Sequence, residues 1–308
     1  MHKKLTVYSS AKLNLYLNVG EKQIDGYHAL ETVFQSIDLY DKLEFILSAE
    51  PDKEKQEIKI IIEESEQSHL LQDPKSNLIY RAAKLFFRTL KDDSFHLTVK
   101  LTKRIPIAAG LAGGSGNAAA TLYALNYLLN EPFKQEVLLS LARELGSDVP
   151  FSLLGGCMLG TGRGDQLTRI TETSDLIFIL ILPPSDITLA TKEVYETFDK
   201  LSLVSNLPNK VSIEKFVQLL ITQGQDASKQ MFNSLEESAV TLNYWVDKAK
   251  TAIDSKGYYS LVSGSGPTVF TIAPNEYQAI SLLQKLQEEG FNAQCHRSIS
   301  ESLMVVSH

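Results

Sequence analysis

The stretch from Pro106 to Gly116 carries the residue types best suited to binding an anion. Four glycines fall within residues 110–116, and an alanine- and leucine-rich segment with helical spacing follows directly. Glycine lets the backbone bend sharply, and the N–H groups at the start of a helix attract negative charge. The pattern favours a phosphate-binding loop. A plain strand-to-helix turn, with glycines for close packing, is the alternative.

Three other segments carry side chains that could act on a ligand. Lys12 and Asn14 share one face of an alternating strand, Ala11–Val19, where they are either solvated or part of a polar site. Tyr27 and His28 follow the turn Asp25-Gly26 and could stack on a flat heterocycle and hydrogen-bond its edge, or merely pack over a hairpin. Asp148 precedes Val-Pro after a helix, which is typical of a cap or turn residue.

The glycine-rich stretch fits neither the P-loop, because no Gly-Lys-Ser/Thr follows it, nor the G-x-G-x-x-G spacing. It resembles the phosphate loop of the GHMP kinases, a P-x-x-x-G-L-x-[GS]-S-type segment that wraps the triphosphate of ATP. The resemblance implies that ATP contacts the following residues: Pro106, Ala109, Gly110, Leu111, Ala112, Gly113, Gly114, Ser115 and Gly116.

The chain departs from the family at Gly116, since the family usually has two consecutive serines before the alanine-rich helix. The missing hydroxyl could remove one hydrogen bond to a phosphate or a metal-bound water, which is worth about 0.5–1.5 kcal/mol. On this reading, Gly116→Ser should lower the apparent ATP constant by no more than about tenfold.

The segments Ala11–Leu15, Asp25–His28 and Gly146–Phe151 narrow the resemblance to one branch of the GHMP kinases. That branch phosphorylates the 2-hydroxyl of a cytidine-diphosphate-linked methylerythritol, with ATP as donor and magnesium implied by the triphosphate. The resemblance implies that Lys12 and Asp148 are catalytic, with the aspartate as general base. It also implies substrate contacts from Asn14, Tyr27, His28, Lys103, Thr191 and Tyr195, with the two tyrosines on either side of the cytosine.

Two rival functions stay open at this point. One is another GHMP small-molecule kinase, such as a homoserine or mevalonate kinase, against which Asp25–His28 argues. The other is a catalytically silent nucleotide-binding protein, suggested by Gly116 and opposed by the retained Lys12 and Asp148.

Hydrophobic periodicity predicts the elements that position these residues. Alternation predicts a strand at His96–Leu101 before the loop, and charge density predicts an exposed hairpin at Ser48–Gln72. A buried strand is expected at Leu176–Leu182. Helices are expected at 77–90, 118–129, 137–145, 191–198, 212–223, 235–255 and 276–289. The Gly-Ser-Gly turn at 264–266 is either an ordinary hairpin turn or, as the resemblance implies, a motif that lies near the phosphates and braces the site.

These elements and the resemblance imply an α+β protein with the two-domain GHMP kinase fold. Its N-terminal ATP-binding domain is expected at residues 1–165 and its C-terminal open α+β sandwich, the substrate domain, at 166–308. A net charge of −7 argues against nucleic acid or an anionic membrane as partner, and leaves small molecules. Two cysteines without metal-type spacing, and an N-terminus that alternates instead of forming an apolar block, favour a cytoplasmic protein.

Overall fold

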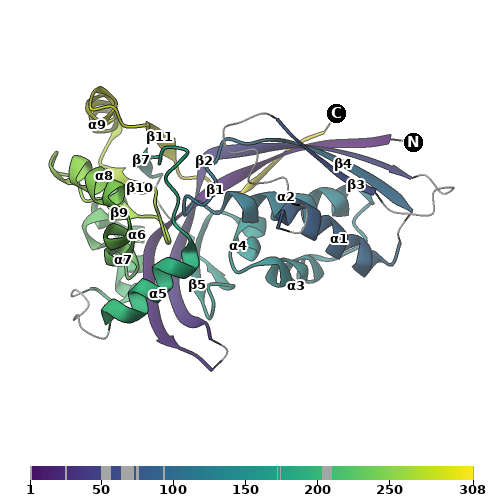
Figure 1. Cartoon of the computed structure of the whole chain (residues 1–308), viewed down its shortest axis with the longest axis horizontal. Helices are drawn as coiled ribbons and strands as arrows, with labels where there is room; N and C mark the ends of the chain where they lie inside the picture. The colour runs from purple at the N-terminus through teal and green to yellow at the C-terminus, as the bar shows by residue number, and fades with distance from the viewer. Residues whose placement is uncertain are drawn as a thin grey trace.

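The computed structural model describes residues 2–24, 26–49, 57–63, 73, 76–92, 94–171, 173, 175–202 and 210–307. Asp25 and most of the charged segment 48–72 lie outside these residues. The described strands form two sheets (Figure 1), a larger one with the path β12-β1-β2-β4-β3 and a smaller one with the order β11-β7-β10-β9. The predicted α+β fold class is confirmed.

Strands β1 (His2–Lys22) and β2 (His28–Ala49) form one long antiparallel pair that links the two halves of the molecule (Figure 1). Register shifts interrupt the pairing between Ser10 and Ala11 and between Asn14 and Tyr16. Such irregularities bend a strand and re-aim its side chains. Lys12 therefore sits on a short stretch of β1 whose direction is set by an irregularity on each side.

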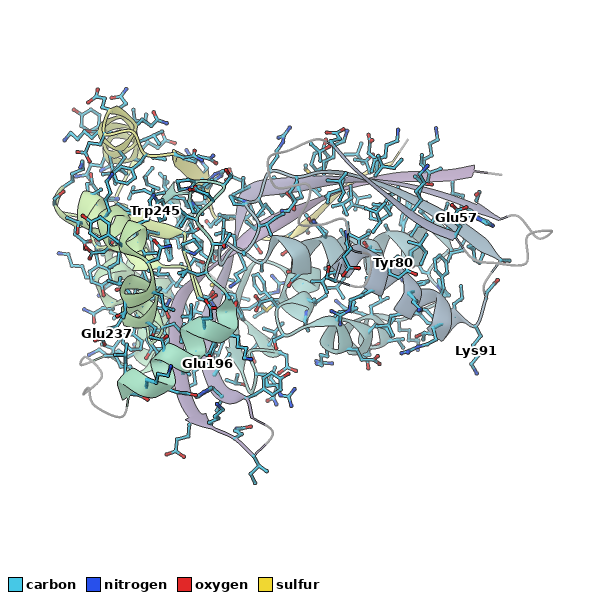
Figure 2. All side chains as sticks on the ribbon, in the orientation of Figure 1. Glu57, Tyr80, Lys91, Glu196, Glu237 and Trp245 are labelled. Carbon is cyan, nitrogen blue, oxygen red and sulfur yellow. The ribbon has the colours of Figure 1, made fainter. Side chains whose placement is uncertain are left out.

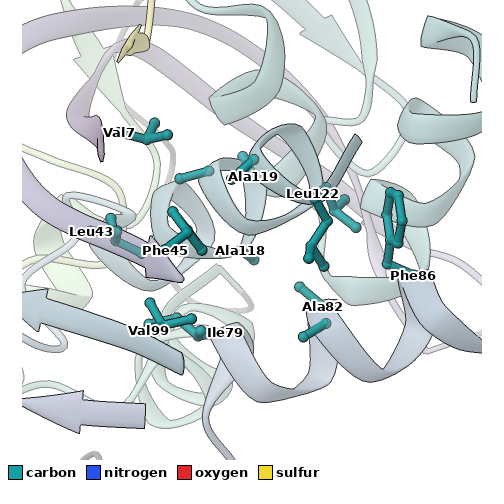
Figure 3. Close-up of a cluster of buried hydrophobic side chains, with 14 of the residues drawn as sticks. Val7, Leu43, Phe45, Ile79, Ala82, Phe86, Val99, Ala118, Ala119 and Leu122 are labelled. Carbon is teal, nitrogen blue, oxygen red and sulfur yellow. The ribbon is translucent and has the colours of Figure 1, made fainter. Parts of the chain in front are cut away.

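Four helices cover one face of the larger sheet: α1 (Leu78–Leu90), α2 (Gly113–Leu128), α3 (Gln135–Leu145) and α4 (Val149–Leu154). Figure 3 shows the core beneath them, where Phe45 and Val99 from the sheet meet Leu122 from α2 and Phe86 from α1. Strand β4 (Phe95–Thr102) alternates as predicted. Helix α2 begins within the glycine stretch itself, so its first turn is part of the loop.

The hairpin predicted at Ser48–Gln72 lies mostly outside the described residues, which include only 48–49 and 57–63 of that segment. Strand β3 (Glu57–Ile62) runs parallel to β4 at the edge of the larger sheet, with Glu57 opposite His96. Its partly buried isoleucines, Ile58, Ile60 and Ile62, pack against the core under α1. The apolar face of β3 therefore extends the sheet.

The smaller sheet consists of β7 (Ile177–Ile181), β9 (Leu261–Val262), β10 (Val269–Ala273) and β11 (Ala293–Arg297). Around it lie α5 (Thr191–Ser202), α6 (Ile213–Gln223), the 3₁₀ helix η2 (Gly224–Gln230), α7 (Glu236–Leu242), α8 (Tyr244–Asp254) and α9 (Glu276–Glu288). The single helix predicted at 235–255 is two helices, because the Asn243 side chain accepts a hydrogen bond from the N–H of Trp245 and starts α8 anew. Trp245 is labelled in Figure 2.

The proposed division between residues 165 and 166 does not follow the sheets. Strand β6 (Gln166–Arg169) pairs with β5 (Cys157–Thr161), and β8 (Phe232–Asn233) pairs with β1. Strand β12 (Leu303–Ser307) returns from the end of the chain to pair with β1, so all three strands belong to the larger sheet. None of the helices in the described part of the chain has the length and apolar character needed to cross a membrane.

Candidate active site

A cleft of about 670 Å³ opens where the bent part of the β1–β2 pair meets the glycine loop and α5. The structure brings most of the predicted site residues to its walls. Those that line it are Lys12, Asn14, Tyr27, His28, Ala109, Gly110, Ala112, Ser115, Asp148, Thr191 and Tyr195.

The Lys12 side chain is buried, and its ammonium group is held by two partners. Its Nζ donates to Asn14 Oδ1 at 2.6 Å and lies 3.6 Å from Asp148 Oδ2. Asn14 in turn donates to the Thr32 hydroxyl, which donates to the Tyr16 carbonyl oxygen, both at 2.8 Å. This chain of donors fixes the direction of the lysine, so its charge is oriented before any ligand arrives.

Asp148 occupies the N-cap position of α4, yet its side chain makes no capping hydrogen bond. Asp148 thus lies in the turn before α4, as the alternative expected, but its side chain does not cap the helix. Its carboxylate instead faces Lys12 across the cleft and is 36% exposed. Tyr195 lies close enough to feel this charge: burial, and after it the Asp148 carboxylate, raise the pKa of the Tyr195 phenol, which stays neutral at physiological pH.

The glycine loop is braced by the turn between β9 and β10. Gly110 has a φ of 76°, and a Cβ there would lie 2.0 Å from the Ser263 carbonyl oxygen. The Ser263 hydroxyl donates to the Gly110 carbonyl oxygen at 3.1 Å, and the Lys12 N–H donates to the Leu111 carbonyl oxygen at 3.1 Å. The loop is thus tied to the smaller sheet on one side and to the lysine strand on the other.

The first turn of α2 lies between the cleft and a second, smaller cavity of about 130 Å³. Ser115 and Ala112 line the cleft, while Pro106 and Gly114 line the smaller cavity. No side chain caps this helix, so its first N–H groups keep their capacity to bind an anion. A ligand with an anionic middle and two different ends could span both cavities across this turn.

Three of the predicted ATP contacts, Leu111, Gly113 and Gly116, line neither cavity. Leu111 is buried in the core. A Cβ at Gly113 would meet the ammonium group of Lys103 at 2.8 Å, and one at Gly116 would lie 3.2 Å from the Ser10 carbonyl oxygen. Gly113 and Gly116 therefore allow α2 to approach its neighbours closely.

The position of Gly116 changes what a serine there should do. The added side chain would be squeezed against the backbone of β1 and against Ser9, outside the cleft. We expect Gly116→Ser to leave the apparent ATP constant within about twofold and to lower the free energy of unfolding by about 1 kcal/mol, the low end for overpacking. Steady-state kinetics and denaturant titration measure both. A lower ATP constant would show that the hydroxyl reaches the ligand, as the family pattern implies.

Lys103 lies apart from the other predicted substrate contacts, in the lining of the smaller cavity. Its ammonium group lies 2.6 Å from Asp41 Oδ2, also donates to the Ile105 carbonyl oxygen, and is outside the lining of the cleft. Burial lowers the pKa of Lys103, and the fully buried Asp41 opposes that shift. A lysine committed to a buried pair supports the loop and is unavailable to a ligand in the cleft.

The aromatic residues differ in part from the predicted arrangement. The Tyr27 ring is 56% exposed at the mouth of the cleft, with the Arg163 guanidinium 4.2 Å from its centroid. The Tyr195 ring packs on His28, with centroids 5.6 Å apart. His28 lines the cleft, while its two ring nitrogens lie next to the Gly20 carbonyl oxygen and the Asp199 carboxylate.

The residues that line the cleft but were not assigned to the site from sequence include Lys22, Thr32, Arg163 and Asp199. Thr32 and Arg163 lie in the segments Leu30–Asp38 and Gly160–Gly164, which also resemble the family, so the sequence did point to their neighbourhood. Lys22 and Asp199 belong to an exposed strand end and an amphipathic helix, where charged residues are ordinary.

Known protein families and relatives resemble this chain in sequence. The family models for the GHMP kinases N terminal domain and the GHMP kinases C terminal match residues 77–156 and 216–292. A 4-diphosphocytidyl-2-C-methyl-D-erythritol kinase of Pelotomaculum thermopropionicum is 39% identical over 269 residues, which cover 86% of this chain and 88% of that relative. The chain belongs to the 4-diphosphocytidyl-2-C-methyl-D-erythritol kinases of the GHMP family.

Solved structures agree with the assignment and show why it depends on sequence. The crystal structure of a 4-(cytidine 5'-diphospho)-2C-methyl-D-erythritol kinase is 27% identical, with a TM-score of 0.73 over 97% of this chain and 99% of that one. A homoserine kinase from Cytophaga hutchinsonii reaches the same TM-score at 19% identity, over 99% of this chain and 98% of that one. The fold is common to GHMP kinases with different substrates, so membership of the family rests on the residues.

Proposed function

We propose that this protein transfers the γ-phosphoryl group of ATP to the 2-hydroxyl of 4-diphosphocytidyl-2-C-methyl-D-erythritol, a step of the non-mevalonate isoprenoid pathway. One observation carries the proposal: the ammonium group of Lys12 and the carboxylate of Asp148 meet in a cleft beside the uncapped start of α2. Phosphoryl transfer needs a base at the acceptor hydroxyl, positive charge at the transferred group and a cradle for the phosphates. These three features lie together here.

Asp148 is the group that takes the proton from the acceptor hydroxyl. Lys12 places a positive charge beside that carboxylate and stabilises the charge that develops on the transferred phosphoryl group. Because Asn14 and Thr32 hold Lys12 in place, little reorganisation is needed during the reaction. A catalytically silent binder would have no use for this arrangement.

The two cavities suggest how ATP binds. Its triphosphate crosses the first turn of α2, with the γ-phosphate in the cleft near Lys12 and the nucleoside in the smaller cavity between Asn77 and Pro106. The cytidylyl substrate then fills the rest of the cleft, where Tyr27 and Tyr195 provide aromatic surface.

Magnesium would be held mainly by the triphosphate. The described residues contain no cluster of three or more His, Cys, Asp or Glu side chains that could hold an ion, which fits an ion bound largely through phosphate oxygens and water. Ser115 is the loop residue that brings a hydroxyl to the cleft. When bound, the ion would offset the negative charge of the phosphates.

The test is ATP consumption by the purified chain with three acceptors in separate assays: the cytidylyl substrate, homoserine and mevalonate. We expect turnover with the cytidylyl substrate alone. Turnover with homoserine or mevalonate would assign a different substrate to the same fold, and ATP binding without turnover on any acceptor would favour a silent nucleotide-binding protein.

Recognition of the base can be tested separately at Tyr27. Stacking on one aromatic side chain is worth about 1–3 kcal/mol, or roughly five- to 150-fold in affinity. Tyr27→Ala should raise the KM for the cytidylyl substrate by that factor, with the KM for ATP nearly unchanged. Tyr27→Phe, which keeps the ring, is the matched control. A higher KM for ATP alone would mean that Tyr27 contacts the adenine of ATP and not the cytosine.

A further inference from the structure

His28 is enclosed between two acceptors. Its side chain is 8% exposed, with Nδ1 2.8 Å from the Gly20 carbonyl oxygen and Nε2 3.0 Å from Asp199 Oδ1. The ring is therefore in close contact with an oxygen on each side. The approach of Nε2 to Asp199 is a short contact without the alignment of a hydrogen bond.

The same carboxylate joins three elements. Its second oxygen, Oδ2, lies 2.9 Å from Nζ of Lys22 at the end of β1, while His28 begins β2. Asp199 itself belongs to α5, which lies beside the outer end of the β1–β2 hairpin, as Figure 1 shows and these contacts require. Figure 2 shows the same helix at Glu196, one turn earlier. Asp199 thus fastens α5 to both strands of the hairpin.

This fastening controls the two aromatic walls of the cleft. The hairpin carries Tyr27 directly before His28, and α5 carries Tyr195 one turn before Asp199. The His28 ring also packs on α5 itself, with centroid distances of 5.6 Å to Tyr195 and 5.9 Å to Phe198. The separation of the tyrosines therefore depends on how firmly His28 is held.

We propose that Asp199 is a positioning residue for the cytidylyl substrate, which sets the distance between Tyr27 and Tyr195 by holding His28 against α5. The inference rests on the proposed function. The contact with His28 matters more than the one with Lys22, because the Lys22 side chain is 54% exposed and an exposed pair contributes little. Asp199 touches neither ATP nor the reacting atoms in this scheme, so it should affect binding of one substrate alone.

Asp199→Asn keeps the size of the side chain and removes its charge. We expect the KM for the cytidylyl substrate to rise about tenfold, equivalent to 1.4 kcal/mol. The kcat and the KM for ATP should stay within about twofold, because Lys12, Asp148 and the glycine loop are untouched. Asp199→Glu restores the charge and should recover most of the lost affinity. Glu193→Gln, which removes an exposed carboxylate from the same helix outside the cleft, should behave as wild type.

A double variant tests the route through His28. If Asp199 acts through that ring, its substitution should have little further effect once His28 is replaced, because the effects of coupled residues do not add. The KM of the double variant His28→Gln, Asp199→Asn for the cytidylyl substrate should then be less than about twofold above that of His28→Gln alone. Lys22→Met should change the KM less than Asp199→Asn does. Thermal unfolding of each variant, measured without substrates, shows which of them are folded.

The outcomes separate the inference from the function beneath it. A wild-type protein without activity on the cytidylyl substrate would overturn the proposed function. An active wild type with an unchanged KM in Asp199→Asn would overturn the inference alone. So would equal losses for both substrates, a fall in kcat with KM unchanged, or no recovery in Asp199→Glu.

Discussion

Asp148→Asn is expected to lower kcat by about 10²–10⁴-fold, the usual contribution of a positioned general base. The amide has nearly the same shape as the carboxylate but cannot accept the proton of the acceptor hydroxyl. The side chain caps no helix, so the stability of α4 should not change. Binding of ATP should also be preserved, because the loop and the start of α2 are unaffected.

The measurement is single-turnover and steady-state phosphorylation, with the dissociation constant for ATP determined on the same preparation. Asp186→Asn is a suitable control, since it removes an exposed carboxylate outside the cleft. If Asp148→Asn retains more than about a third of the wild-type kcat, the carboxylate is not the base, and the proton leaves by another route.

Local patterns in the sequence predicted the parts of the site that local physics decides. The alternation around Lys12 and the helix at Asn77–Leu90 formed as expected, because one face of each is apolar. The strand at Leu176–Leu182 also formed as expected, because it is apolar throughout and buried on both faces. The glycine stretch also predicted the start of a helix correctly, although α2 begins earlier than its leucine pattern indicated.

Contacts between distant segments could not be predicted in the same way. Whether Lys103 reaches a ligand depends on Asp41, which is brought beside it by the pairing of β2 with β4. Whether the ring of His28 faces the cleft depends on Asp199, which approaches it only once α5 has packed against the hairpin. Each is a charged or polar group whose partner is set by the tertiary fold, and periodicity carries no information about such pairs.

The predicted domain boundary at residues 165 and 166 stays a prediction. It follows chain order, whereas strand β12, at the end of the chain, pairs with β1. A boundary read from sequence takes each domain as one continuous segment, and a strand that returns from the far end of the chain is not visible to that reasoning.

Gly110→Ala should have the largest effect of any single methyl group added to the loop. The φ of 76° is costly for alanine, by about 1–2 kcal/mol, because its Cβ approaches the following carbonyl oxygen. In addition, the new Cβ would meet the Ser263 carbonyl oxygen at 2.0 Å, so either the loop or the β9–β10 turn must move. Overpacking of this kind costs about 1–3 kcal/mol. The free energy of unfolding should therefore fall by about 2–5 kcal/mol.

A glycine elsewhere in the chain separates the two causes. Gly257 has a φ of 84°, and a Cβ there would meet nothing within 4 Å. Gly257→Ala should therefore lose only the backbone contribution of about 1–2 kcal/mol, with normal kinetics. In Gly110→Ala, displacement of the loop should also raise the KM for ATP and lower kcat. The Leu111 carbonyl oxygen accepts a hydrogen bond from the N–H of Lys12, so a shift of the loop also shifts the strand that carries this lysine. Denaturant unfolding measures the loss of unfolding free energy in both variants. Equal losses would mean that the β9–β10 turn moves aside at no cost in free energy and does not brace the loop.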